Sequence, residues 1–147
     1  MTVYPATLDD IPDLCDLLDL LFSQEAEFEP DPARQAAGLS AIISDPHTGV
    51  ILTLVDNGHI VGMVNLLFLV STYLGARAAI LEDLVVLPSH RGSGGGTILL
   101  NAAVEEARRQ GCKRITLLTD HDNMGARKFY ERNGFYLSSM VPYRFML

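Results

Sequence analysis

Residues 91–97 read RGSGGGT, which places four glycines in five positions directly before a helix-forming run. Glycine inside a regular element costs roughly 0.5–1 kcal/mol relative to alanine, so this cluster indicates a demand on the backbone itself. Main-chain N–H groups at a helix N-terminus, aided by the positive end of the helix dipole, form an anion site. The loop is therefore predicted to bind a phosphate-bearing ligand, with glycines that let the amides close around it.

Three ligand-binding patterns compete for this loop. Gly92 and Gly94 fit the start of the dinucleotide fingerprint GxGxxG, with Asp120 as the ribose-binding acid, but the third glycine is absent. A complete two-lobed dinucleotide fold would also need more chain than follows the loop. A P-loop requires a lysine after the glycines, and none is present. The pattern RxxGxG is met in full by Arg91, Gly94 and Gly96.

A second pattern lies downstream, where residues 123–135 read NMGARKFYERNGF. With RxxGxG and the preceding LEDLVVLPSHRG, the sequence resembles the GCN5-related N-acetyltransferase (GNAT) superfamily, including its motif N-x-x-A-x-x-F-Y-x-x-x-G-F. The resemblance spans nearly the whole chain and is weakest between about residues 22 and 54. The chain departs from the family at Gly95, where relatives carry a bulkier aliphatic residue, and at Gly125, within a predicted helix. We expect both glycines to loosen the cofactor site without abolishing binding.

The resemblance implies an α/β (α+β) fold with one mixed, largely antiparallel sheet and helices on both faces. A parallel central pair of strands would splay around the cofactor, acetyl-CoA. The implied reaction is direct transfer of acetyl to a primary amine of a small molecule or peptide, without a covalent enzyme intermediate. The alternative is a module of the same fold that binds coenzyme A as a sensor or partner domain and has no catalytic activity.

Direct transfer makes three chemical demands. The amine, with a pKa of about 10.4, must lose a proton before it attacks, and the developing oxyanion needs a hydrogen-bond donor. The departing thiolate is best protonated. The resemblance places Glu82 as the general base, acting through water, and Tyr130 as the general acid. A solvated or ion-paired role stays open for Glu82, and core packing beside Phe129 stays open for Tyr130.

Strand alternation predicts that Glu82, Leu84 and Val86 share one face, whereas Asp83 and Val85 point to the other. Asp83 is expected to be structural. The resemblance implies that the backbone of this strand binds the pantetheine arm as an added strand would, and that Asn123 binds the arm or caps its helix. The expected cofactor contacts are Leu84, Val85, Val86, Arg91, Gly92, Ser93, Gly94, Gly95, Gly96, Thr97, Asn123 and Ala126.

These residues must be positioned by a fold whose elements follow from periodicity and turn signals. Apolar spacing predicts a helix in IPDLCDLLDLLF, a second helix from Asp31 to about Ser44, a helix after the glycines, and another in NMGARKFYERN. Asp56-Asn57-Gly58 predicts a hairpin. Strands are predicted in TVYPAT, on both sides of that turn, in ARAAILEDLVVL and RITLLT, and as a closing pair in FYLSSMVPYRFML.

Bulk composition limits the classes of partner. The 147 residues, 48% of them hydrophobic, suit one domain over 1–147, and the formal net charge of −7 argues against nucleic acid. The four histidines show no ligand spacing, so no metal site is expected. No apolar run reaches membrane-spanning length, and no basic start or apolar leader is visible, so a cytoplasmic location is expected.

An exposed edge strand near the C-terminus would permit a homodimer. The run QEAEFEP, with Glu25, Glu27 and Glu29, would favour a cationic amine or simply be a solvated loop.

Overall fold

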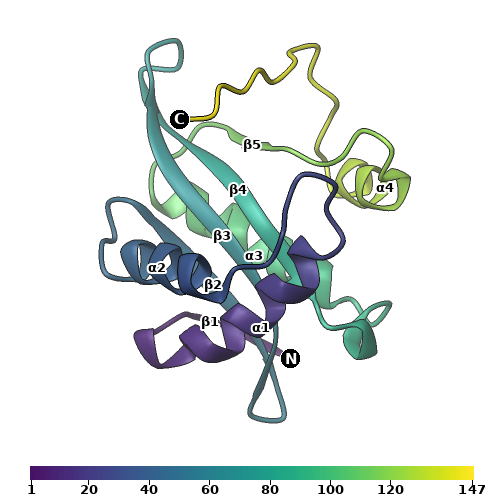
Figure 1. The fold of residues 1–147 in the computed structure, drawn as a ribbon. Coiled ribbons are helices and arrows are strands. Elements are labelled where there is room, and N and C mark those ends of the chain that lie inside the picture. The colour runs from purple at the N-terminus through teal and green to yellow at the C-terminus, as the bar shows by residue number, and fades with distance from the viewer.

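The computed structural model describes residues 1–147, arranged as one five-stranded sheet with helices on both faces (Figure 1). The strands, which also give the spatial order, are β1 (Thr2–Pro5), β2 (Gly49–Asp56), β3 (His59–Ser71), β4 (Ala76–Val86) and β5 (Ile115–Leu117). The helices are α1 (Ile11–Phe22), α2 (Pro32–Ile43), α3 (Gly95–Arg109) and α4 (Met124–Arg132), with 3₁₀ turns η1 (Leu8–Asp10) and η2 (Pro88–His90).

The sheet is antiparallel from β1 to β4, and β5 pairs with β4 in parallel. The β2–β3 hairpin turns at Asn57 and Gly58, whose φ angles of 48° and 78° suit the left-handed turn that the sequence predicts. The mixed, largely antiparallel sheet is thereby confirmed. Its parallel pair lies at one edge rather than in the centre, because the sheet ends at β5.

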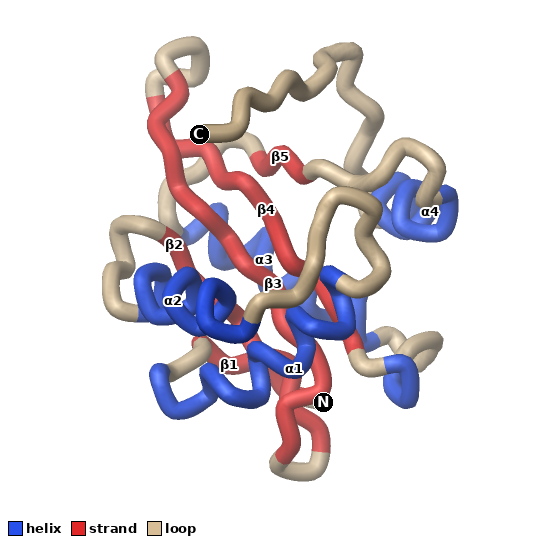
Figure 2. Tube along the Cα trace, in the orientation of Figure 1, coloured by secondary structure: helices blue, strands red, loops and turns tan.

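Helices cover both faces of the sheet (Figure 2). A hydrophobic core on each face holds them to it. On one face, α3 buries Leu99, Leu100 and Ala103 against β2, β3 and β4. On the other face, α1 and α2 bury a separate cluster that includes Leu14 and Leu39. The crossover from β4 through α3 to β5 therefore lies on the side of the sheet opposite α1 and α2.

A β-bulge interrupts β4 in its second half. Met63 pairs with Val85, whereas Asn65 pairs with Glu82, so β4 has one more residue than β3 between these pairs. Asp83 lies in the bulge with a φ of 55°, a left-handed conformation that is uncommon outside glycine. The extra residue re-aims the side chains on either side of it.

Because of the bulge, the strand alternation that the sequence predicts is wrong here. Leu84 and Val86 pack into the core beneath α3, and Val85 packs into the core beneath α1 and α2. Glu82 lines a cavity on the α1 and α2 side, so it does not share a face with Leu84 and Val86. Asp83 lines that same cavity. Glu82 and Asp83 therefore border one cavity, although consecutive residues of a regular strand would face opposite sides of the sheet.

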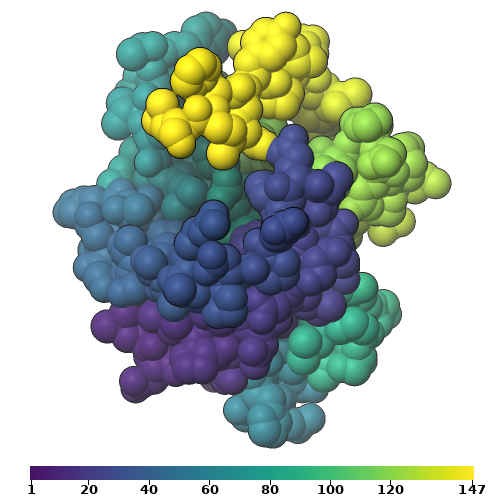
Figure 3. All heavy atoms as spheres, in the orientation of Figure 1, coloured from purple at the N-terminus to yellow at the C-terminus, as the bar shows by residue number.

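The predicted closing strand pair is also wrong, since residues 136–147 form no strand. Pro142 has no N–H to donate to a ladder, and Arg144 forms an ion pair with Glu27 of the α1–α2 loop rather than with a neighbouring strand. Figure 3 shows this C-terminal segment in yellow above the dark blue α1–α2 loop. The two segments, far apart in sequence, form neighbouring parts of one rim.

None of the helices has the length and apolar character needed to span a membrane.

Candidate active site

The glycine loop is built to leave main-chain N–H groups free at the start of α3. Gly92 and Gly94 have φ angles of 77° and 88°, so both positions favour glycine. Gly94 is the N-cap of α3, and no side chain caps the helix. The first N–H groups of a helix have no partner within it, so those of Gly95, Gly96 and Thr97 are available to an anion.

The other two glycines of the loop lie against neighbouring side chains, and of the two only Gly95 is too tightly packed to take a Cβ without movement of its neighbour. A Cβ at Gly95 would lie 2.9 Å from Leu54 Cδ2, and one at Gly96 would lie 3.4 Å from Phe129 Cζ. Gly95 therefore lets the start of α3 sit directly on the sheet. Leu54 fills the space that a bulkier residue at position 95 would occupy. Gly95 therefore forms a close contact here, whereas the sequence led us to expect a looser cofactor site.

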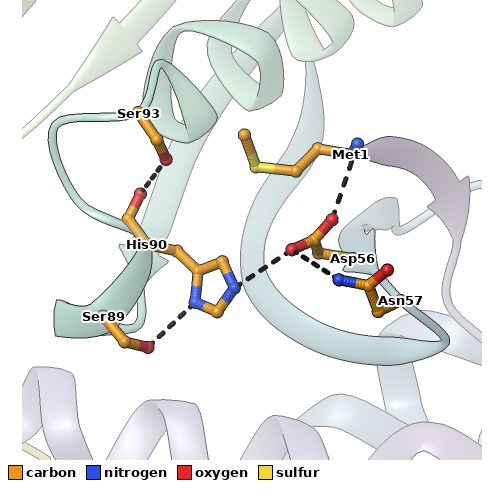
Figure 4. A network of polar contacts seen from close by, with 6 residues as sticks. All are labelled: Met1, Asp56, Asn57, Ser89, His90 and Ser93. Carbon is orange, nitrogen blue, oxygen red and sulfur yellow. Dashed lines mark hydrogen bonds and ion pairs between the residues drawn. The ribbon is translucent and has the colours of Figure 1, made fainter.

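Side chains on the turn before α3 fasten the loop to the rest of the fold. Arg91 Nε donates to the carbonyl of Val86 at 3.0 Å, and Ser93 Oγ donates to the carbonyl of His90 at 2.6 Å. His90 Nε2 lies 3.2 Å from Asp56 Oδ2, and Asp56 also pairs with the N-terminal amino group (Figure 4). The His90 ring therefore joins the loop to the β2–β3 hairpin.

Strands β4 and β5 separate after a short parallel ladder, and a cavity of about 130 Å³ lies where they part. The ladder ends at the Leu81–Leu117 pair, so the edge of β4 beyond Leu81 has no partner strand. Asn123 and Ala126 line this cavity, and Asn123 Oδ1 accepts the Ala126 N–H at 3.1 Å. Of the two roles expected for Asn123, the capping role is confirmed.

Tyr130 lines the same cavity, where α4 faces the gap between the strands. Its ring makes edge contacts with Phe129 and Phe135, with centroids 5.2 and 5.7 Å apart. Burial, and secondarily the charge of Glu25, raise the pKa of Tyr130 to about 12. The phenol therefore stays protonated at neutral pH, and it is able to donate a proton or a hydrogen bond into the cavity.

A larger cavity of about 530 Å³ opens on the α1 and α2 side of the sheet. Its apolar wall comes mainly from α1, α2 and the loop between them, including Leu18, Phe22, Phe28 and Leu39. Its polar wall is dominated by carboxylates: Glu25, Glu27, Glu29, Asp31, Glu82, Asp83 and Asp120. The two guanidinium groups in the wall, of Arg34 and Arg144, already pair with Asp31 and Glu27.

The two cavities meet at a group of acidic residues. Glu25, Glu82, Asp83 and Asp120 line both. Burial raises the pKa of Glu25 to about 6, with further contributions from Asp83, Asp120 and Glu82. Burial also raises the pKa of Asp83 to about 6, against the lowering effect of a hydrogen bond from Asn65. The junction thus has a strongly negative potential, and a cation entering it would relieve the repulsion.

Asp83 and Asn65, which line the larger cavity, were not predicted from the sequence as part of the site. Asp83 was expected to be structural, and Asn65 was not assigned a role at all. A signal for Asn65 was present, because it interrupts the apolar run IVGMVNLLFLV. A buried amide within such a run needs hydrogen-bond partners, which points to a polar site beside it. No group of three or more His, Cys, Asp or Glu side chains is arranged to hold a metal ion.

Comparisons with known proteins agree with this geometry. Residues 11–135 match the model of the acetyltransferase (GNAT) family. The chain is 38% identical over 118 residues to the N-acetyltransferase YhfO of Bacillus subtilis, covering 78% of each chain. It is 32% identical over 130 residues to the aminoalkylphosphonate N-acetyltransferase of Salmonella typhimurium, covering 88% of this chain and 81% of that one. A solved structure from Bacillus halodurans, described as a transcriptional regulator, superposes with a TM-score of 0.84 at 28% identity and 99% coverage of both chains.

The chain therefore belongs to the GNAT acetyltransferase family. It is an N-acetyltransferase, an acyltransferase that depends on acetyl-CoA.

Proposed function

We propose that the chain transfers acetyl from acetyl-CoA directly to a primary amine that enters the larger cavity as a cation. The observation that carries this proposal is the junction of the two cavities. The cavity between β4 and β5 and the acid-lined cavity share Glu25, Glu82 and Asp83. A thioester in the first and an amine in the second would meet beside these carboxylates, which is the arrangement that direct transfer requires.

The residues on the cofactor side fit coenzyme A. The free N–H groups of Gly95, Gly96 and Thr97 and the dipole of α3 suit its diphosphate, and the Arg91 guanidinium adds positive charge beside them. The unpaired edge of β4 suits an extended arm, as an added strand would. When bound, acetyl-CoA supplies the acetyl thioester. Leu84, Asn123 and Ala126 line the intervening groove.

Glu82 and Tyr130 then have complementary roles. Glu82 accepts the proton that the ammonium must lose, through a water molecule, before nitrogen forms its bond to the acetyl carbon. Tyr130, whose pKa is raised to about 12, donates a proton to the sulfur as the carbon–sulfur bond breaks. Nitrogen loses two protons in all: Glu82 takes the first and passes it to solvent, and the second leaves once the carbon–nitrogen bond has formed and replaces the proton that Tyr130 gives to the sulfur. The amide, the free thiol and one released proton balance the transfer.

The charge of the larger cavity favours an acceptor with a net positive charge. Its wall holds seven carboxylates and two guanidinium groups, both already paired. The Salmonella relative is named for aminoalkylphosphonates, which combine a primary amine with an anion. The amine of such a compound suits the junction, whereas its phosphonate would have only Arg34 and Arg144 as counter-ions. We therefore expect diamines to be better acceptors than aminophosphonates.

A second function is supported by one comparison. The Bacillus halodurans relative is described as a transcriptional regulator, which fits a module that binds coenzyme A without catalysis. Glu82 at the cavity junction and Tyr130 beside it favour the enzyme.

Two measurements separate these functions. In a thermal-shift assay, acetyl-CoA should raise the melting temperature and NAD should leave it unchanged. Release of free thiol from acetyl-CoA is then followed over ethylamine, 1,4-diaminobutane, spermidine, L-lysine and 2-aminoethylphosphonate. Faster release with the diamines supports the proposal. Stabilisation by acetyl-CoA without release for any amine would instead support the binding module.

A further inference from the structure

Asn65 is a buried amide with one unused hydrogen-bonding atom. It is 3% exposed in the middle of β3 and pairs across the ladder with Glu82. Its Nδ2 donates to Asp83 Oδ2 at 3.3 Å, whereas its Oδ1 is the one buried side-chain oxygen or nitrogen with no hydrogen-bond partner. Leaving a buried acceptor unpaired destabilises a fold, so a partner for this atom is expected from outside the chain.

The surroundings of Asn65 show what kind of partner is suitable. The residue lines the larger cavity together with Glu82 and Asp83, so a ligand in that cavity has access to this corner. All three side chains present oxygen atoms, and none of those oxygens bears a hydrogen when the carboxylates are ionised. A donor with several hydrogens and a positive charge matches them. A primary ammonium group carries three such hydrogens.

The bulge in β4 explains how three oxygens reach one place. In a regular strand Asp83 would point away from Glu82, but its φ of 55° turns it toward the same cavity. Such a conformation is disfavoured for a residue with a side chain and is found where function requires it. The bulge also brings Asp83 within reach of Asn65. The Asp83 carboxylate accepts a hydrogen bond from Asn65 Nδ2 and so fixes the orientation of the amide.

We propose that Asn65 Oδ1 and the Asp83 carboxylate bind the amino group of the acceptor, beside Glu82. This rests on the proposed function, since it names the contacts of the same amine. Asn65 and Asp83 hold the nitrogen in the ground state and during transfer, and Glu82 remains the group that takes up the proton. A primary ammonium group should bind here more tightly than a tertiary one, which has a single hydrogen to donate to these oxygens and, once deprotonated, none to lose on acetylation.

The test compares two replacements of Asn65, with the panel amine that gives the fastest thiol release as the probe. Asn65→Leu has a similar volume but no acceptor, and it should raise KM for the amine at least ten-fold while kcat changes less than three-fold. Asn65→Asp keeps an acceptor oxygen at this place but loses the amide N–H groups, and its KM should stay within about three-fold of the original.

Thr53→Val is the matched control. Thr53 is equally buried on the neighbouring strand β2, its hydroxyl is satisfied by the carbonyl of Tyr4, and it does not line the cavity. This variant should lower the melting temperature and leave KM for the amine unchanged. The Kd for acetyl-CoA should be unaffected in all three variants, as measured by calorimetry.

The outcomes distinguish the possible errors. An unchanged amine KM in Asn65→Leu would overturn the contact at Oδ1. An equal rise of KM in Asn65→Leu and Asn65→Asp would overturn it as well, since the amide would then act only by donating to Asp83. If Asn65→Leu does not fold, the KM of Asn65→Asp for the amine tests the proposal instead. A rise of ten-fold or more in that KM contradicts the contact at Oδ1. Failure of the proposed function is a separate result, because the unmodified protein would then release no thiol with any amine.

Discussion

The two halves of the site use different parts of the polypeptide. The cofactor half is a main-chain site, formed by one continuous stretch from Arg91 to Thr97 and the free edge of β4. The acceptor half is a side-chain site, assembled from the α1–α2 loop, β3, β4, the segment after β5 and the C-terminal segment. A main-chain site needs glycine at fixed positions, and a side-chain site needs only that distant residues converge. The first leaves a local pattern in the sequence and the second does not.

The halves also differ in electrostatic sign. The start of α3 presents N–H groups and the positive end of a dipole, with Arg91 nearby. The acceptor half presents the carboxylates of Glu25, Glu82, Asp83 and Asp120. Under the proposed function each half binds a substrate of the opposite charge, and the two substrates meet at the junction. Mutations that affect one half should leave affinity for the other substrate nearly unchanged.

Tyr130 lines the smaller cavity beside the junction, so its replacement should affect the reaction without affecting either affinity. Tyr130→Phe is expected to lower kcat by about 10²–10³-fold, since loss of a general acid typically costs 10²–10⁴-fold. The ring contacts with Phe129 and Phe135 are kept, so the melting temperature should change little. Steady-state thiol release with the fastest panel amine measures the effect. Tyr136→Phe, at an exposed tyrosine, is the control and should keep full activity. Full activity in Tyr130→Phe would remove the general-acid role.

The local conformation of the proposed cofactor half could be predicted largely from sequence. The positive φ angles at Gly92 and Gly94 and the cap at Asn123 follow from residue type and position. The pairing of β2 with β3 was also predictable, because the turn at Asn57-Gly58 fixes the hairpin. Each of these features depends on interactions between residues close in sequence.

The acceptor half could be predicted only in part. Periodicity assumes a regular strand, so it could not reveal the bulge that turns Asp83 toward Glu82. The C-terminal segment was predicted as strands from its apolar content, but the ion pair of Arg144 with Glu27 depends on a contact between the two ends of the chain. Such long-range contacts leave no local pattern. The acidic residues were visible in the sequence, and their convergence was not.

Replacement of one loop glycine should separate the halves by affinity. At Gly94, with a φ of 88°, a side chain costs roughly 1–2 kcal/mol, so Gly94→Ala should weaken acetyl-CoA binding about ten-fold and lower stability by a similar energy. Gly125→Ala is the control, because Gly125 is helical and its nearest neighbour would lie 3.8 Å from the new Cβ. It should stabilise the protein by about 0.4–1 kcal/mol. Calorimetric titration with acetyl-CoA and thermal melts measure both effects. A ten-fold rise of the amine KM in Gly94→Ala would contradict the separation of the halves.

The smallest expected effect is a pH-dependent change in melting temperature, caused by the charge of Asp83 in the protein without substrates. Burial raises the pKa of Asp83 from 3.8 to about 6, so the folded state favours the neutral acid. Its contribution to stability is present in full below pH 3.8 and is lost as the pH rises through 6. At pH 8 the buried charge is destabilising, and Asp83→Asn should raise the melting temperature by about 2–4 °C, the shift expected for roughly 1 kcal/mol in a chain of this size. The difference between the two melting temperatures should be smaller at pH 5 and should close only as the pH approaches 3.8. Glu131→Gln, at an exposed carboxylate on α4, should show no such dependence. Thermal melts between pH 5 and 8 test this, and an equal difference at both ends would show that Asp83 is not titrating in that range.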